Sequence, residues 1–162
     1  MQLLNAIEEL EQELYENAVA IVEGDLPYGL KGVYHNDRLR GLIVLTTGLP
    51  GPERLSVLAE EAGHYYTSAG NILNLDQALS RKLERRARGW AYERLVPPEG
   101  IITAWRDYVR TPWELAEYFS VTCRFFADAI SYYRQKHAPA WHVDRYRITF
   151  EPFSVAKHQP QG

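Results

Sequence analysis

The sequence lacks most of the features that mark membrane proteins and disulfide-rich proteins. Cys123 is the single cysteine, so no internal disulfide forms, and its place in an aromatic helix predicts a small core residue. No apolar run approaches the roughly 20 residues that cross a membrane. Residues 1–16 are acidic, whereas a signal peptide begins with basic residues. These absences predict a cytoplasmic protein with no membrane segment.

Markers of several other functional classes are missing as well. The chain has no internal repeat, no glycine-rich phosphate loop and no Gly-x-Ser-x-Gly elbow. Its net charge of −3 over 162 residues is not the usual footprint of a stand-alone nucleic-acid binder. The charge is uneven, because residues 8–25 are acidic whereas residues 81–94 carry Lys82 and five arginines. The simplest interpretation of the basic run is a solvated helix face.

What is present is an ordinary globular composition. Hydrophobic residues make up 46% of the chain and charged residues 24%, which suits one domain of this length. We therefore expect a single domain over residues 1–162. Its expected parts are an N-terminal helix at 1–24, a core at 25–97, a helical extension with a return strand at 98–156, and a tail at 157–162.

Hydrophobic periodicity predicts a mixture of helices and strands. Residues 2–22 repeat at helical spacing, and two apolar segments, 30–34 and 40–47, have strand character and are joined across Asn36-Asp37. The second segment is almost continuously apolar, so we expect it to be a central strand. Further predicted elements are a helix from Pro52, a helix from about Asn74 to Leu95, short helices at 101–108, 112–119 and 121–135, and a strand at 145–151 that returns to the sheet.

The helix from Pro52 carries the sequence Glu-Glu-x-x-His at residues 60–64. This is the zincin pattern His-Glu-x-x-His with glutamate in place of the first histidine. Residues four apart lie one helical turn above each other, so the side chains of Glu60 and His64 can converge on one metal ion. Glu61 stands beside them, where a carboxylate can take the proton of a metal-activated water. The spacing therefore offers two ligands and a general base.

An ordinary explanation of the same residues stays open. On a helical wheel the apolar residues of this segment share one arc, and Glu60, Glu61 and His64 share the other. Two glutamates and a histidine are common on the polar face of an amphipathic helix. The motif also lacks the second histidine that makes the usual zinc pattern specific.

The next helix supplies a second clue to a metal site. Glu84 falls at the edge of its apolar stripe, about 20° from Ala91 and Leu95 on the helical wheel. A carboxylate in such a place is unfavourable unless it is paired or bound to a metal. A salt bridge to Arg88, four residues further on, is the alternative explanation.

The segment 112–135 has the outline of a helix-turn-helix, with a tight turn at Ser120-Val121. Its second helix carries little positive charge beyond Arg124, Arg134 and Lys136, which favours a packing role over the reading of DNA. DNA contact through this segment remains the alternative.

Four stretches, taken in order, resemble the ImmA/IrrE-type metallopeptidases, especially the version found in phage-like and mobile elements. They are Leu58 to Leu73, Glu84 to Pro97, Trp113 to Thr122 and Ile148 to Pro152. The resemblance covers nearly all of the chain after about residue 25. The departure from the family pattern is Glu60, which occupies the place of the first ligating histidine.

The resemblance leads us to expect an α+β zincin-like fold, in which a short sheet packs against an active-site helix and a ligand helix, followed by small C-terminal helices. It implies that His64 and Glu84 are metal ligands and that Glu61 is the general base. Glu60 and a water would complete the site. Two carboxylates and one imidazole form a harder, more anionic set than usual, so Zn²⁺ is the expected cofactor and Mn²⁺ the alternative.

On this basis we expect a metal-dependent endopeptidase that cuts a partner protein. The resemblance suggests that the partner is a helix-turn-helix repressor of a phage or mobile element, cleaved to switch on its genes. The alternative, favoured by Glu60, is a non-catalytic regulatory module that binds a repressor or, through residues 112–135, DNA. Tyr65, Tyr66 and His142 are candidates for stabilising the oxyanion by their chemistry alone.

Overall fold

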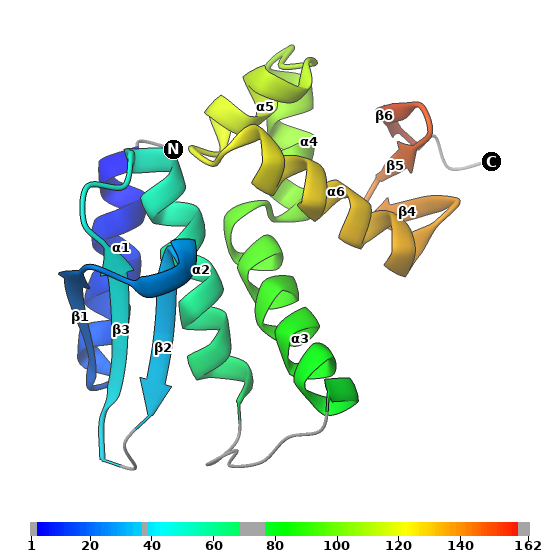
Figure 1. Ribbon diagram of the computed structural model, residues 1–162. Coiled ribbons are helices and arrows are strands. Elements are labelled where there is room, and N and C mark those ends of the chain that lie inside the picture. Colours follow the sequence, from blue (N-terminus) through cyan, green and yellow to red (C-terminus); the bar gives the residue numbers. More distant parts are fainter. Residues whose placement is uncertain (1–2, 37–38, 69–76, 159–162) are drawn as a thin grey trace.

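The computed structural model describes residues 3–36, 39–68 and 77–158 (Figure 1). An N-terminal part combines helices with a small sheet, and a C-terminal part adds further helices and a second small sheet. Buried apolar side chains from Ala6 to Val155 form one hydrophobic cluster. The chain is thus an α+β protein, as the sequence predicted. None of the helices within these ranges is both long and apolar enough to cross a membrane.

The first helix is shorter than the sequence predicted. α1 spans Leu3–Glu16 and buries Ala6, Leu10 and Leu14, whereas Val19–Gly24 forms strand β1 instead of continuing the helix. The expectation of one helix through residue 22 is wrong, because the run Val-Ala-Ile-Val is rich in β-branched side chains that pack well on a sheet.

Strand β1 lies at one edge of a three-stranded sheet with the order β1-β3-β2. β2 (Gly32–Asn36) and β3 (Gly41–Thr46) pair in antiparallel fashion, which confirms the predicted pair of strands. β1 pairs in parallel with β3 along its whole length, and a short 3-10 helix, η1 (Pro27–Gly29), connects β1 to β2. β3 is therefore the central strand, as its continuous apolar sequence predicted.

The long helix α2 stands next to this sheet, and a second long helix, α3, lies on the far side of α2 (Figure 1). α2 spans Gly51–Thr67, with Pro52 in its first turn as predicted, and packs on β2, β3 and α1. α3 spans Gln77–Leu95 and packs against α2. The predicted helix start at Asn74 lies outside the described residues. The arrangement places α2, with the Glu-Glu-x-x-His motif, between the sheet and α3.

The C-terminal part begins with three helices, α4 (Pro98–Arg106), α5 (Pro112–Tyr118) and α6 (Cys123–His137). Thr111 closes a capping box at the start of α5, and the Thr122 side chain accepts a hydrogen bond from the backbone N–H of Phe125 in the first turn of α6. Cys123, the first residue of α6, is exposed. The expectation of a core cysteine is wrong.

The strand predicted at 145–151 does not return to the first sheet. β5 (Tyr146–Phe150) lies between β4 (Ala140–Val143) and β6 (Phe153–Lys157) in a separate antiparallel sheet. The expectation is wrong because alternation identifies a strand but not its partner. Here the short turns on both sides of β5 supply partners that are close in sequence.

Candidate functional site

A backbone contact between α2 and α3 positions the candidate site. Gly63, in the interior of α2, is buried against Ala87 of α3. A Cβ atom on Gly63 would lie 2.8 Å from the carbonyl carbon of Ala87 and nearer still to its oxygen, so no larger residue fits. Glycine in a helix interior is less favourable than alanine by about 1 kcal/mol, and the close approach of the helices explains its presence. Sequence reasoning passed over Gly63, although an isolated glycine inside a helical pattern was a usable signal.

This contact brings the histidine of the motif to the acidic residue of the second helix. His64 follows Gly63, and its Nε2 atom lies 3.2 Å from Oε2 of Glu84. The other carboxylate oxygen of Glu84, Oε1, accepts a hydrogen bond from Nε of Arg88 at 3.0 Å. Glu84 therefore makes the salt bridge to Arg88 that was the alternative explanation for its position, and it also contacts His64. Two of the three residues predicted as metal ligands are neighbours.

Glu60 lies one turn before His64 on the same side of α2. Burial raises the pKa of its carboxyl, Arg88 opposes that rise, and the charges of Glu84 and Asp128 add to it. The Glu60 carboxyl is thus within electrostatic reach of Glu84. Across the described ranges, no three His, Cys, Asp or Glu side chains are arranged as a metal cluster. The structure pairs His64 with Glu84 and leaves Glu60 outside that pair.

Glu61 turns toward the sheet. Its carboxyl accepts a hydrogen bond from the backbone N–H of Tyr34 in β2. Its Oε1 lies against Gly32, where an added Cβ would come within 3.1 Å of it. Burial raises the pKa of Glu61 to about 7, the Tyr34 N–H opposes this rise, and the charges of Glu60 and Glu84 add to it. A carboxyl with a pKa near neutrality is suited to taking up and releasing a proton.

A cleft of about 450 Å³ opens beside Glu60, between residues of α2, α3 and α6. Charged and aromatic side chains line it, among them Arg88, Tyr92, Phe125 and Asp128. A cleft of this size accommodates a small ligand or a few side chains of a peptide. The predicted site therefore has a concave surface next to it.

The three side chains considered for oxyanion stabilisation are engaged elsewhere. The Tyr66 hydroxyl donates a hydrogen bond to Glu13 at 2.7 Å, and the Tyr65 hydroxyl donates to the backbone oxygen of Asn17 at 3.5 Å. His142 lies on β4, in the C-terminal sheet. The two hydroxyl groups thus bond to α1 and to the residue that follows it, and His142 belongs to an element other than α2 and α3.

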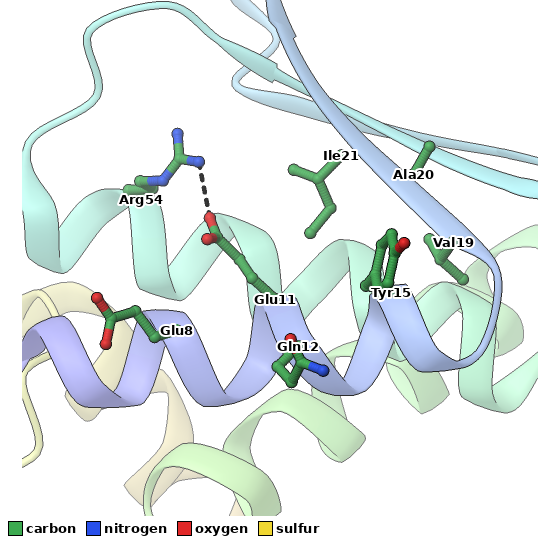
Figure 2. A pocket seen from close by; sticks show the side chains of 8 residues that line it. All are labelled: Glu8, Glu11, Gln12, Tyr15, Val19, Ala20, Ile21 and Arg54. Atoms are coloured by element: carbon green, nitrogen blue, oxygen red, sulfur yellow. Dashed lines mark hydrogen bonds and ion pairs between the residues drawn. The ribbon is translucent and has the colours of Figure 1, made fainter.

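A second hollow, of about 490 Å³, lies between α1 and β1 (Figure 2). Arg54 of α2 extends into it and pairs with Glu11 at 2.8 Å and with Glu23. Neither the Glu-Glu-x-x-His motif nor Glu84 contributes to its lining. The hollow therefore belongs to the packing of the N-terminal helix and is separate from the candidate site.

The side chains at the candidate site suit a divalent cation chemically. His64 offers an imidazole nitrogen and Glu84 a carboxylate oxygen, and both side chains are partly exposed, by 25% and 43%, so water reaches them. Glu60 and Glu61 add two carboxylates on the preceding turn of α2. Nitrogen and oxygen donors of this kind bind Zn²⁺ and Mn²⁺. The donor atoms of these residues therefore suit a metal of the predicted type, although the described residues bring only His64 and Glu84 into direct contact.

Residues 17–131 match the family model of the IrrE N-terminal-like domain, a peptidase family. The match covers well over half of the chain and contains Glu60, Glu61, His64 and Glu84. Nothing among the curated proteins or the solved structures matches the chain.

Proposed function

Because the chain belongs to the IrrE N-terminal-like family, whose domain is of the metallopeptidase type, we propose that it is a metal-dependent endopeptidase acting on a partner protein. The observation that carries this proposal is the contact between His64 of α2 and Glu84 of α3. Two residues from different helices, both implicated as ligands of one ion, lie side by side. The carboxylates of Glu60 and Glu61 occupy the turn before His64.

In this proposal His64 and Glu84 hold the metal, and Glu60 is the third protein ligand. When bound, a divalent cation lowers the pKa of its water and polarises the carbonyl group of the substrate. Zn²⁺ is the expected ion, and Mn²⁺ is the alternative because two carboxylates make a harder site. Arg88 positions Glu84 by donating to Oε1, which leaves Oε2 on the side of His64.

Glu61 is the residue that moves the proton. Its carboxylate takes a proton from the attacking water and then delivers it to the amine of the leaving peptide. The backbone N–H of Tyr34 and the close packing of Gly32 restrict the position of this carboxyl. Glu61 thus acts from the side of β2, whereas the proposed ligand Glu84 approaches from α3.

The substrate would occupy the cleft beside Glu60. The resemblance to phage and mobile-element metallopeptidases favours a helix-turn-helix repressor as the partner. Its cleavage in the cytoplasm would switch on the genes that it represses. The charged lining of the cleft suits a polypeptide better than an apolar small molecule, because backbone amides and polar side chains find hydrogen-bond partners there.

Cleavage of a co-expressed helix-turn-helix repressor tests this function. The wild-type protein supplied with Zn²⁺ or Mn²⁺ is expected to cut the repressor, and Glu61→Gln is expected to leave it intact while keeping its fold and its metal. Glu117→Gln is the matched control, because Glu117 is exposed on α5. Equal cleavage by Glu61→Gln would remove Glu61 from the mechanism.

A second candidate function is a regulatory module that binds a partner protein without cutting it. Glu60 in place of a ligating histidine favours this candidate. His64 contacts Glu84, and the described residues show no third His, Cys, Asp or Glu side chain grouped with these two. Metal analysis separates the two candidates. Near-stoichiometric zinc or manganese that is lost in His64→Ala supports the enzyme, and its absence after metal supplementation supports the module.

Binding of DNA through residues 112–135 has weaker support. Arg134 pairs with Glu151, Lys136 binds Glu93, and Arg124 lies 3.9 Å from Asp128. The positive charges of α6 are therefore largely compensated within the protein. If the protein causes no mobility shift of duplex DNA even at low salt, the hypothesis of DNA binding is eliminated.

A further inference from the structure

A groove of about 600 Å³ separates the exposed side of α3 from the C-terminal half of α6. We call it the cationic groove and define it by Lys82, Arg85, Arg86, Trp90, Tyr132 and Lys136, all of which line it. It is distinct from the cleft beside Glu60, with which it shares no lining residue. Neither the metal chemistry nor the proton transfer proposed above uses any of its side chains.

Of the cations that line this groove, Lys136 of α6 is paired with Glu93, whereas those of α3 are not neutralised by the protein itself. Arg88 and Arg94 of α3 pair with Glu84 and Glu13. Lys82, Arg85 and Arg86 are exposed, and none has a carboxylate partner in the part of the chain that the structure describes. Like charges three and four residues apart on a helix repel each other. This repulsion destabilises α3 when the groove is empty, and a bound anion would relieve it.

The groove also contains a rigid aromatic surface. Trp90 stacks on Tyr66, with ring centroids 4.7 Å apart. Tyr132 lies directly over Gly89, where an added Cβ would come within 3.0 Å of the phenol ring. These rings are held by their neighbours, so an apolar side chain can pack on them without ordering them first. The groove thus combines unpaired cations with an apolar platform.

The single carboxylate among the lining residues indicates which kind of anion fits. Glu93, near the C-terminal end of α3, accepts hydrogen bonds from Tyr132 and from Lys136 of α6, each at 2.7 Å. A nucleic-acid backbone would meet this carboxylate and a protein of net charge −3, both of which repel a dense polyanion. A polypeptide with a few acidic residues and an apolar side chain carries fewer negative charges, so this repulsion is weaker, and its apolar side chain can pack on the aromatic rings.

The position of the groove connects it to the candidate site. Arg85 follows Glu84, whose carboxylate contacts His64, and Thr67, which also lines the groove, lies three residues after His64 on α2. We propose that the cationic groove docks an acidic segment of the protein that the site cleaves. This inference rests on the proposed function for the identity of the partner, but the docking itself needs no chemistry.

Binding by the full chain carrying Glu61→Gln tests the docking apart from cleavage. The probe is a fluorescein-labelled peptide rich in Asp and Glu with one Leu and one Phe, and its twin carries Asn and Gln at the acidic positions. Fluorescence anisotropy is expected to show binding of the acidic peptide that weakens as salt rises, and roughly tenfold weaker binding of the amide twin.

Variants of α3 locate the binding surface. Arg85→Glu combined with Arg86→Glu is expected to weaken binding of the acidic peptide roughly tenfold. Arg81→Glu is the matched control, because Arg81 lies on the same helix and is exposed but does not line the groove. It is expected to change the affinity less than about twofold. Arg85→Gln with Arg86→Gln makes the same test without reversing charge, and circular dichroism checks the fold of every variant.

Two results would overturn the proposal. One is unchanged affinity for the acidic peptide when both Arg85 and Arg86 are replaced in a folded protein. The other is tighter binding of duplex or single-stranded DNA than of the peptide, which would assign the groove to nucleic acid. A protein that docks the peptide but cuts no repressor would refute the peptidase and keep the groove, so the two failures are distinguishable.

Discussion

Replacing Gly63 by alanine is the most informative structural perturbation of the site. The new Cβ would lie 2.8 Å from the carbonyl carbon and 3.0 Å from the Cα of Ala87, whereas carbon atoms in contact are about 3.5–4.0 Å apart. The obstacle is helix backbone, which cannot rotate away as a side chain can. α2 and α3 must therefore separate by about 1 Å, and His64 moves away from Glu84.

Two opposing effects set the size of the stability change. Overpacking in a core typically destabilises by about 1–3 kcal/mol, and the backbone contact at Gly63 points to the upper end. Alanine regains about 1 kcal/mol of helix propensity. The free energy of unfolding of Gly63→Ala is therefore expected to fall by about 2 kcal/mol. In a folded Gly63→Ala protein, metal affinity should fall as well, because the ligand pair depends on this approach.

Urea unfolding followed by circular dichroism measures the first effect, and isothermal titration with Zn²⁺ measures the second. Gly51→Ala is the matched control on the same helix, because its Cβ would meet only the flexible end of the Leu3 side chain. It is expected to leave both quantities nearly unchanged. A Gly63→Ala protein as stable as wild type with unchanged metal affinity would refute the claim that backbone contact sets the site.

Two further changes test other parts of the account. Gly32→Ala places a Cβ 2.6 Å from Cγ1 of Val57 and 2.9 Å from Cγ of Glu61, so repressor cleavage should drop while metal content stays; undiminished cleavage would show that Glu61 does not need its place against β2. Tyr133→Phe removes the buried hydroxyl that donates to the Val96 carbonyl at 2.9 Å and should lower the free energy of unfolding by about 1–2 kcal/mol; an unchanged urea midpoint would mean that the bond contributes no net stability.

Strong periodicity made the central elements predictable from sequence. The apolar run of β3 and the proline at the start of α2 both led to correct elements. Residues 19–24 were misassigned because Ile21 lies at a helical spacing from the apolar residues of α1 as well as in a β-branched run. Pairing partners were the weakest point, as β5 shows, because which strands come together depends on the whole chain.

For the site, sequence spacing placed Glu60 and His64 on one side of α2 and Glu84 at the edge of the buried stripe of α3. The contact of His64 with Glu84 could not be predicted from spacing, since it depends on how closely two helices approach. A helical wheel also could not predict that the Glu61 side chain points toward β2, because this orientation depends on the strand against which α2 packs. Whether these residues bind metal stays a prediction.

The most direct test of the central claim is the metal content of the purified full chain after growth with zinc and manganese. Elemental analysis is expected to find near-stoichiometric metal in wild type and in Glu117→Gln, and little in His64→Ala or Glu84→Gln. Full metal content in a folded Glu84→Gln protein would contradict the claim, because the contact between the two helices would then have no part in holding the ion.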